Sequence, residues 1–305
     1  MNRRRLRISL ALLAAMSCLT CFANAEDSPF KTDLVAKEPD LMHPSALAFD
    51  GKGRLFVGGG PQFRNPKPDT PPDFIKMLAD NNGDGEYETI KTFASGFNSI
   101  QGLAWRGRDL WVANAPDVTI VRDTNGDDVA DEYVRVFTGL GHLRHGLHGF
   151  NWAPDGMLYM SQGDSQVQKH APRAWRELMH VESDLPDNQP LNEVFKPGEY
   201  KHDWIGSWPS GEGGMLRCDH TGHKLEIFAR GMLNPWYVCF DDDFNWLGTD
   251  NDSGGEHDRI FMPFFGAHFG YRHPWSSSWT GRDHPPTAPA SGLFPSGGEI
   301  GRAHV

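Results

Sequence analysis

Two histidines stand immediately before an apolar segment of this sequence. His145 and His148 lie in the stretch 144–164, RHGLHGFNWAPDGMLYMSQGD. An imidazole with an ordinary pKa near ~6.5 accepts a proton at neutral pH and can act as a general base. His142 extends the set at a spacing of three, and three imidazoles could instead bind a transition metal. Flanking glycines favour a tight loop over a helix. We expect His145 to be catalytic, with His148 as the second candidate.

The segment after these histidines is expected to form a β-hairpin. Pro154-Asp155-Gly156 supplies the turn between two apolar runs. Similar pairs of apolar runs recur at residues 46–58, 102–114 and 236–248. Along the chain, Leu47, Leu103 and Phe150 of the first three hairpins are spaced by roughly 50 residues, the period of a propeller blade. The 34 Gly and 22 Pro also favour short strands joined by turns. The sequence therefore predicts an all-β fold, a β-propeller of four-stranded blades.

Only four blade signatures are present, and residues 297–305 show no closing strand. A propeller needs typically 4–8 blades to close its ring. We therefore expect an incomplete propeller, the amino-terminal part of a longer protein. The gap between the third and fourth hairpins is too long for one blade, which predicts an insertion at about residues 166–214. Its Trp175, Trp204 and Trp208 could stack on a sugar ring or pack into a local cap.

The first 25 residues read as a secretory signal rather than as part of the fold. Arginines at positions 3, 4, 5 and 7 precede an apolar run, and Ala23-Asn24-Ala25 supplies a small-residue cleavage site. The apolar run is short for a membrane anchor. We expect residues 26–305 to form the propeller domain of a periplasmic or secreted protein. Membrane association of the full-length protein stays open.

Export leaves two cysteines in an oxidising compartment, Cys218 and Cys239. They could pair in a disulfide. Each lies in an apolar, strand-like segment, so two buried free thiols are the alternative.

The charge balance disfavours some partners and favours others. The chain carries 29 Lys and Arg against 40 Asp and Glu, a net charge of −11. Nucleic acid and anionic membrane surfaces are poor partners for such a protein, and divalent cations are better ones.

Loops 80–86 and 123–128 resemble the start of a calcium loop, but we expect Asx-stabilised turns there.

A third acidic loop follows the apolar strand at residues 246–248. Its carboxylates are hard oxygen donors, which suit Ca²⁺ better than Zn²⁺. A solvated loop is the alternative. The predicted metal ligands are Asp250, Asp252, Glu256 and Asp258.

Three motifs in the same order resemble the soluble glucose and sorbosone dehydrogenase family. They are His145-Gly-Leu-His148 before the Pro-Asp-Gly turn, Leu233-Asn234-Pro235-Trp236, and the acidic loop followed by GAHFGYRHPW at 266–275. The chain resembles in particular the secreted membrane-bound dehydrogenases of planctomycetes, in which a cytochrome c domain often follows. The resemblance implies a six-bladed propeller, the cofactor pyrroloquinoline quinone, calcium, and a sugar or alcohol substrate.

The resemblance also implies roles for single residues. A histidine at the position of His145 removes the proton of the substrate hydroxyl while hydride passes to the quinone. Asn234 matches a cofactor-contacting asparagine, and Gln101 lies near a second cofactor position. Leu233 departs from the family, which has an arginine there. A cytochrome c is the implied electron acceptor. The alternatives are a calcium-dependent lactonase and a propeller that only binds carbohydrate or protein.

Overall fold

The computed structural model describes residues 33–62, 67, 69–141, 145–165, 167–183, 188–201, 211–250, 259–269 and 271. The chain divides into two compact units, Met1–Lys37 and Glu38–Val305. All described strands and the helix α2 (Arg173–Leu178) lie in the second unit. No described helix is long and apolar enough to cross a membrane. The expected signal sequence lies outside the described residues.

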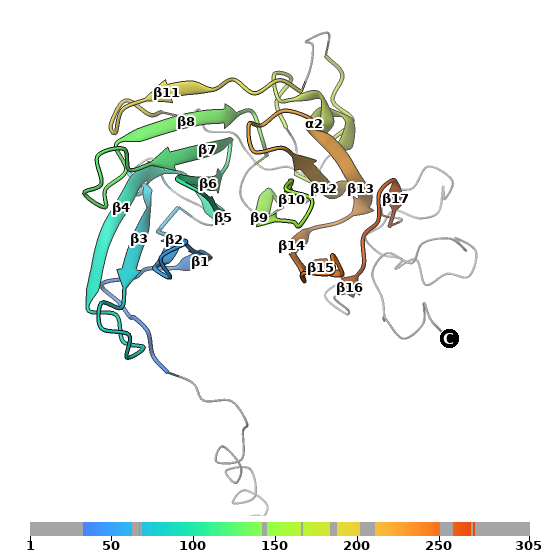
Figure 1. Cartoon of the computed structure of the whole chain (residues 1–305). Coiled ribbons are helices and arrows are strands. Elements are labelled where there is room, and N and C mark those ends of the chain that lie inside the picture. The colour runs from blue at the N-terminus through green and yellow to red at the C-terminus, as the bar shows by residue number, and fades with distance from the viewer. Residues whose placement is uncertain are drawn as a thin grey trace, which may run out of the picture. The chain divides into compact units, whose positions relative to one another are not determined.

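The strands form four separate sheets, which confirms the predicted β-propeller (Figure 1). Blade 1 contains β1 (Pro44–Phe49), β2 (Leu55–Gly59), β3 (Asp73–Ala79) and β4 (Thr89–Phe97). Blade 2 contains β5 (Ile100–Arg106), β6 (Asp109–Asn114), β7 (Asp117–Arg122), β8 (Glu132–Phe137) and the later β11 (Glu193–Phe195). Blade 3 contains β9 (Leu147–Trp152), β10 (Leu158–Gln162), β12 (Gly213–Cys218), β13 (Glu226–Met232) and the short parallel β17 (Ala267–His268). Blade 4 contains β14 (Pro235–Phe240), β15 (Trp246–Asp250) and β16 (Arg259–Phe261).

The four predicted hairpins are the first two strands of the four blades. Each pair is antiparallel. An aspartate closes several of the turns by accepting backbone N–H groups with its side chain, as Asx-turn chemistry requires. Asp155 accepts from the Met157 N–H at 2.9 Å, and Asp241 accepts from the Asn245 N–H at 2.8 Å. Gly156 completes the first of these turns at a φ of 80°.

The innermost strands of consecutive blades lie next to one another, β1 beside β5, β5 beside β9, and β9 beside β14. Each of them carries a β-bulge near its first residue. A bulge places one extra residue in a strand and redirects a side chain. The bulge residues are Ser45 in blade 1, Gln101 in blade 2, His148 with Gly149 in blade 3, and Trp236 in blade 4.

Apolar side chains fill the boundaries between consecutive blades. Phe56 of blade 1 and Leu103 of blade 2 belong to one buried cluster. Trp111 of blade 2 and Phe150 of blade 3 belong to the next. The outer boundaries differ: Leu47 and Phe49 on β1 are 62% and 60% exposed, and Leu247 and Ile260 in blade 4 are 50% and 49% exposed. Blades 1 and 4 therefore each leave an apolar face uncovered by the described residues.

The segment between β10 and β12 reaches two blades. Trp175 of α2 is fully buried and donates its indole N–H to Gln162 at 3.0 Å. This tryptophan packs in a buried core cluster, as a local cap requires, and has no exposed face on which a sugar ring could stack. Farther along the segment, β11 pairs with β8 and Tyr200 donates to Asp117 in blade 2 at 2.6 Å. Trp204 and Trp208 lie outside the described residues.

The two cysteines among the described residues are free thiols. Cys218 ends β12 in blade 3 and is buried, whereas Cys239 lies on β14 in blade 4 and is exposed. The disulfide hypothesis is therefore wrong, because the two residues belong to different blades and differ in burial. The alternative of two buried thiols is right only for Cys218. Burial raises the pKa of the Cys218 thiol, since a desolvated thiolate is unfavourable.

This arrangement predicts selective thiol labelling. In the folded protein a maleimide reagent should modify Cys239 within minutes and leave Cys218 unmodified. In denaturant both should react. Peptide mass spectrometry measures the two sites separately. Recovery of a Cys218–Cys239 disulfide from protein exported to an oxidising compartment would contradict the structure.

Candidate functional site

The candidate site lies where the innermost strands of blades 3 and 4 begin. His145 immediately precedes β9, and Asn234 immediately precedes β14. Both border Gly163, which follows β10. A Cβ atom built on Gly163 would lie 2.5 Å from Asn234 Oδ1 and 2.6 Å from the carbonyl oxygen of His145. Such distances are shorter than van der Waals contact, so the site requires glycine at this position. The fold thus brings together His145 and Asn234, which are far apart in the sequence.

Backbone hydrogen bonds fix this corner. The Gly163 N–H donates to the Gly146 carbonyl at 2.9 Å, and the Ser165 N–H donates to the His145 carbonyl at 3.1 Å. The Asp164 N–H crosses to blade 4 and donates to the Leu233 carbonyl at 2.9 Å. The site is therefore built on strand ends and their hydrogen-bonded continuations.

A carboxylate orients His145. Its Nδ1 lies 2.6 Å from Oδ1 of Asp164, whose side chain is 1% exposed. The Tyr271 hydroxyl donates to the second oxygen of Asp164 at 2.9 Å. The His145 side chain is 24% exposed, and Nε2 has no hydrogen-bond partner among the described residues. A histidine whose Nδ1–H is held by a carboxylate presents the lone pair of Nε2, the arrangement of a general base.

The sequence did not single out Asp164 or Tyr271. Asp164 ends the stretch that contains both histidines, directly after the second strand of the hairpin. That position is a usable signal, because the end of the second strand lies beside the start of the first. Tyr271 is 107 residues from Asp164, and no local pattern links them. His142 lies outside the described residues, so the idea of a three-histidine metal site stays a prediction.

His148 has a different environment from His145. It is completely buried, its ring stacks on Trp236 with centroids 4.1 Å apart, and its Nε2 lies 2.7 Å from Oδ1 of Asn234. Burial lowers the pKa of His148 to about 3, because a buried imidazolium loses its hydration. The side chain is neutral at physiological pH. It lacks the solvent contact that a proton acceptor for a substrate needs.

The buried imidazole predicts how stability depends on pH. The unfolded chain binds a proton at this residue below pH ~6.5, whereas the folded chain does so only near pH 3. Acidification from pH 6.5 should therefore lower the free energy of unfolding, by up to about 1.4 kcal/mol per pH unit from this group. His148→Phe, which cannot titrate, should lose less stability over the same range. Urea denaturation at pH 7 and pH 4.5 measures both slopes, and parallel losses would contradict the prediction.

Asp250 supports the start of β14. It is 3% exposed, its Oδ1 accepts the Asn234 N–H at 2.7 Å, and its Oδ2 accepts the Leu233 N–H at 3.3 Å. Both oxygens of this predicted metal ligand therefore accept backbone N–H groups. The other three predicted ligands, Asp252, Glu256 and Asp258, lie outside the described residues.

Gln101 lies at the bulge of the inner strand of blade 2, the position that His148 occupies in blade 3. It is 5% exposed, and its Nε2 donates to Ser99 Oγ at 3.0 Å. The structure gives Gln101 and His148 equivalent places in neighbouring blades. Among the described residues, no hydrogen bond joins Gln101 to His145 or Asn234.

The described groups fit part of a quinone cofactor. Carbonyl oxygens of a quinone need hydrogen-bond donors, and the carboxamides of Asn234 and Gln101 can supply them. The carboxylates of pyrroloquinoline quinone favour nearby cations. Leu233 is apolar and 6% exposed, so this position supplies none. The donors and the base are therefore compatible with the quinone, and the electrostatic match is weaker than the family resemblance implies.

The loops at 80–86 and 123–128 form the Asx-stabilised turns that we expected. Asp80 accepts the N–H groups of Gly83 at 2.6 Å and Gly85 at 2.9 Å, and Asp123 accepts that of Gly126 at 2.7 Å. Those backbone bonds lower the pKa of Asp80. Asp80, Asp84 and Glu88 could together surround an ion, but their side chains are partly or fully exposed.

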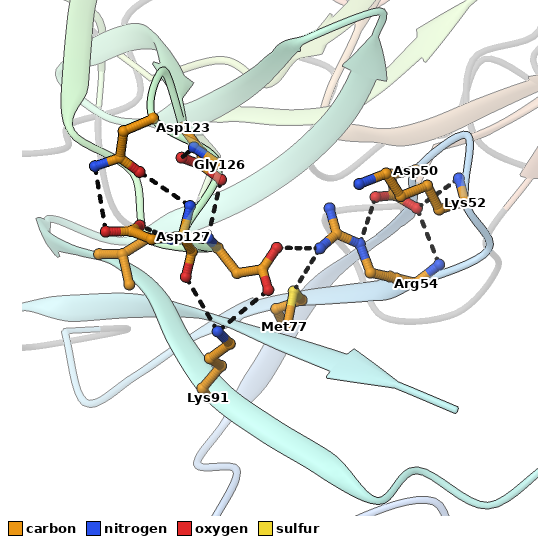
Figure 2. Close-up of polar contacts among 11 residues, drawn as sticks. Asp50, Lys52, Arg54, Met77, Lys91, Asp123, Gly126 and Asp127 are labelled. Atoms are coloured by element: carbon orange, nitrogen blue, oxygen red, sulfur yellow. Dashed lines mark hydrogen bonds and ion pairs between the residues drawn. The ribbon is translucent and has the colours of Figure 1, made fainter. Parts of the chain in front are cut away.

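The second of these turns joins two blades. Figure 2 shows Arg54 between Asp50 of its own hairpin and the turn of blade 2. Its guanidinium lies 2.8 Å from Asp50 and 2.5 Å from Asp128, and Lys91 lies 3.2 Å from Asp128. The Asp128 carboxylate is therefore neutralised by two cations, and its role is structural.

Several solved structures are similar to this chain. An enzyme of Carbohydrate-Active Enzymes Family AA12 from Trichoderma reesei, in an iodide structure, has a TM-score of 0.50 and 14% identity, over 81% of this chain and 60% of that one. The PQQ-bound aldose sugar dehydrogenase of Streptomyces coelicolor has a TM-score of 0.49 and 16% identity, over 84% and 67%. A putative oxidoreductase (glucose dehydrogenase) of Thermus thermophilus has a TM-score of 0.46 and 19% identity, over 75% and 64%.

At these identities the similarity concerns the fold. The chain spans 60% to 67% of the length of these three proteins. No curated protein sequence matches the chain at a significant level. A family model does match, over residues 23–185, which include blade 1, strands β5 to β8 of blade 2, His145, His148 and Asp164. Because that match covers more than half of the sequence, the chain belongs to the family described as "Domain of unknown function (DUF7133)".

Proposed function

We propose that this propeller oxidises a sugar or alcohol, with His145 as the general base. The observation that carries the proposal is the geometry of His145, whose Nδ1 is held 2.6 Å from the buried Asp164 and whose Nε2 is free among the described residues. Oxidation of a hydroxyl requires removal of a proton from oxygen and a hydride from carbon. His145 would take the proton at Nε2, and Asp164 would stabilise the imidazolium that forms.

Pyrroloquinoline quinone is the proposed acceptor of the hydride. When bound, it supplies the two-electron oxidation, which turns the substrate C–H and O–H into a carbonyl. Asn234 and Gln101 are the proposed residues that hold it, through their carboxamide groups. The electrons of the reduced quinone would pass to a cytochrome c. The order of the three sequence motifs supports this assignment.

Calcium is the proposed metal, held by carboxylates of the loop that follows β15. Asp252, Glu256 and Asp258 are the proposed ligands. Asp250 is the fourth proposed ligand, and its oxygens also accept the Leu233 and Asn234 N–H groups, which tie it to the start of β14. The resemblance to planctomycete-type secreted dehydrogenases and a periplasmic or secreted location belong to the same proposal.

The uncovered faces of blades 1 and 4 support a further part of the proposal. Where two described blades meet, large apolar side chains such as Phe56 and Phe150 are almost fully buried. Leu47 and Leu247 lie on the outer faces and are at least half exposed. Burial of such side chains is worth roughly 25 cal/mol per Å². We propose that additional propeller blades cover these two faces in the full-length protein.

A lactonase is the second candidate, favoured by one observation. Leu233 supplies no cation for the quinone carboxylates. A calcium-bound water activated by His145 would instead hydrolyse a sugar lactone. In this reaction no electron acceptor is needed.

Steady-state assays of the full-length protein distinguish these functions. The protein is expressed with its signal sequence, loaded with calcium and pyrroloquinoline quinone, and tested for aldose-dependent reduction of a redox dye. A pH-stat assay with a sugar lactone runs in parallel. Dye reduction that requires both aldose and quinone supports the proposal. Lactone hydrolysis without quinone supports the lactonase, and inactivity in both assays with binding of oligosaccharide supports a binding propeller.

A further inference from the structure

The side chain of Asn234 is held by its oxygen. Oδ1 lies 2.7 Å from Nε2 of His148, and Gly163 packs so closely against it that a Cβ there would approach to 2.5 Å. The other branch of the carboxamide differs. Among the described residues, Nδ2 has no hydrogen-bond partner. It does not belong to the set of completely buried polar atoms without a partner. Asn234 is 5% exposed, so Nδ2 is the polar atom of a largely buried side chain that has no partner among the described residues.

His148 is fixed in place around this bond. Its ring stacks on Trp236 at an interplanar angle of 24°. Its backbone is held against blade 2, because a Cβ on Gly102 would lie 2.8 Å from the His148 carbonyl oxygen. The ring is neutral and fully buried, so it carries one N–H and one lone pair. The stacked and buried ring presents Nε2 to Asn234.

The burial of Nδ1 indicates which nitrogen of the neutral His148 ring carries the proton. Nδ1 of His148 is enclosed and lacks a partner among the described residues. If the proton were on Nδ1, a buried N–H donor would be left unbonded, and Asn234 would have to turn its NH₂ group toward Nε2. With the proton on Nε2, the imidazole donates to Oδ1 and only a lone pair stays unbonded at Nδ1. An unsatisfied buried donor costs about 1–3 kcal/mol, so the second arrangement is preferred.

We infer that His148 is a positioning residue, which fixes the carboxamide of Asn234 so that its NH₂ group faces the bound ligand. The ligand atom at this point is then an oxygen that accepts a hydrogen bond, such as a quinone carbonyl or a carboxylate. The identification of that ligand as a quinone rests on the proposed function. The orientation of Asn234 does not. His148 thus contributes to binding from the boundary between blades 3 and 4 without contacting the ligand.

Two substitutions separate the hydrogen bond from packing. His148→Phe keeps an aromatic ring against Trp236 but removes the donor. His148→Gln restores a side-chain N–H at a similar distance from the backbone. NMR of the full-length protein locates the imidazole proton through ¹H–¹⁵N correlations, and Asn234→Asp assigns the side-chain amide of Asn234. Titration with pyrroloquinoline quinone in the presence of calcium gives the dissociation constant of each variant.

The expected result has three parts. The wild-type protein shows a slowly exchanging proton on Nε2 of His148. His148→Phe shifts the Asn234 side-chain amide signals and raises the quinone dissociation constant about tenfold or more, whereas His148→Gln recovers most of the affinity. A proton on Nδ1, or unchanged Asn234 signals in His148→Phe, would overturn the inference. A wild-type protein that binds no quinone but shows the Nε2 proton and the shifted amide signals would overturn the proposed cofactor and retain the positioning role.

Discussion

Replacement of His145 by alanine is expected to lower the turnover number for aldose oxidation by about 10²- to 10⁴-fold, the usual contribution of a general base. The loss should appear in kcat more than in KM, because proton removal contributes to the transition state rather than to substrate binding. Steady-state dye reduction by the quinone-loaded protein measures both constants. The quinone dissociation constant should stay within a few-fold of the wild-type value.

The control for this prediction is a second histidine in blade 3. His223 is exposed in the turn between β12 and β13, where it lies 2.9 Å from Thr221 Oγ1. His223→Ala should retain wild-type turnover. Circular dichroism would show whether both variants keep the strand content of the wild type. Full activity in a folded His145→Ala protein would remove this residue from the mechanism.

Replacement of Asp117 by alanine is expected to lower the free energy of unfolding by about 3–5 kcal/mol, the cost of removing one partner of a buried charge pair. Asp117 is completely buried in blade 2. It lies 3.0 Å from Nε of Arg135, accepts the Tyr200 hydroxyl at 2.6 Å and accepts a hydrogen bond from Thr138. The substitution would leave the Arg135 guanidinium, whose side chain is 15% exposed, without its buried counter-ion.

Tyr200→Phe is the matched variant. It removes one hydroxyl from the same network and keeps the ring that stacks on Tyr133 at 5.8 Å. The hydroxyl donates to Asp117, accepts from Asn114 Nδ2 at 2.7 Å and lies 3.0 Å from Thr119 Oγ1. Its removal leaves neutral buried groups without a partner, which predicts a decrease of about 1–3 kcal/mol, smaller than the effect of Asp117→Ala. Urea denaturation followed by tryptophan fluorescence measures both variants. Equal effects of the two substitutions would contradict the assignment of Asp117 as the buried charge that attaches the 188–201 segment to blade 2.

The repeated hairpins could be predicted from the sequence because their signals are local. The Pro154-Asp155-Gly156 turn and the alternation around it specify strand, turn and strand without reference to the rest of the chain. The recurrence of the unit then indicated the propeller. The path of the insertion could not be predicted, because the pairing of β11 with β8 joins segments separated by more than fifty residues.

The site was predicted less completely than the fold. His145 and Asn234 were identified from motifs, and the structure places both beside Gly163. The partners of His145 were missed, because Tyr271 reaches Asp164 only through the three-dimensional fold. The sequence analysis placed His145 ahead of His148 but could not show that His148 is completely buried. A bulge in β9 leaves His148 in the boundary with blade 4, and bulge positions depend on pairing with β10 rather than on local sequence.

Single-turnover reduction of bound quinone tests the central claim most directly. The full-length protein, loaded with calcium and pyrroloquinoline quinone and freed of unbound cofactor, is mixed with excess aldose without dye, and the absorbance of the quinone is followed. The proposed mechanism predicts saturable quinone binding and loss of the oxidised spectrum on addition of aldose. A protein that binds no quinone, or whose bound quinone stays oxidised with every aldose and alcohol tested, would contradict it.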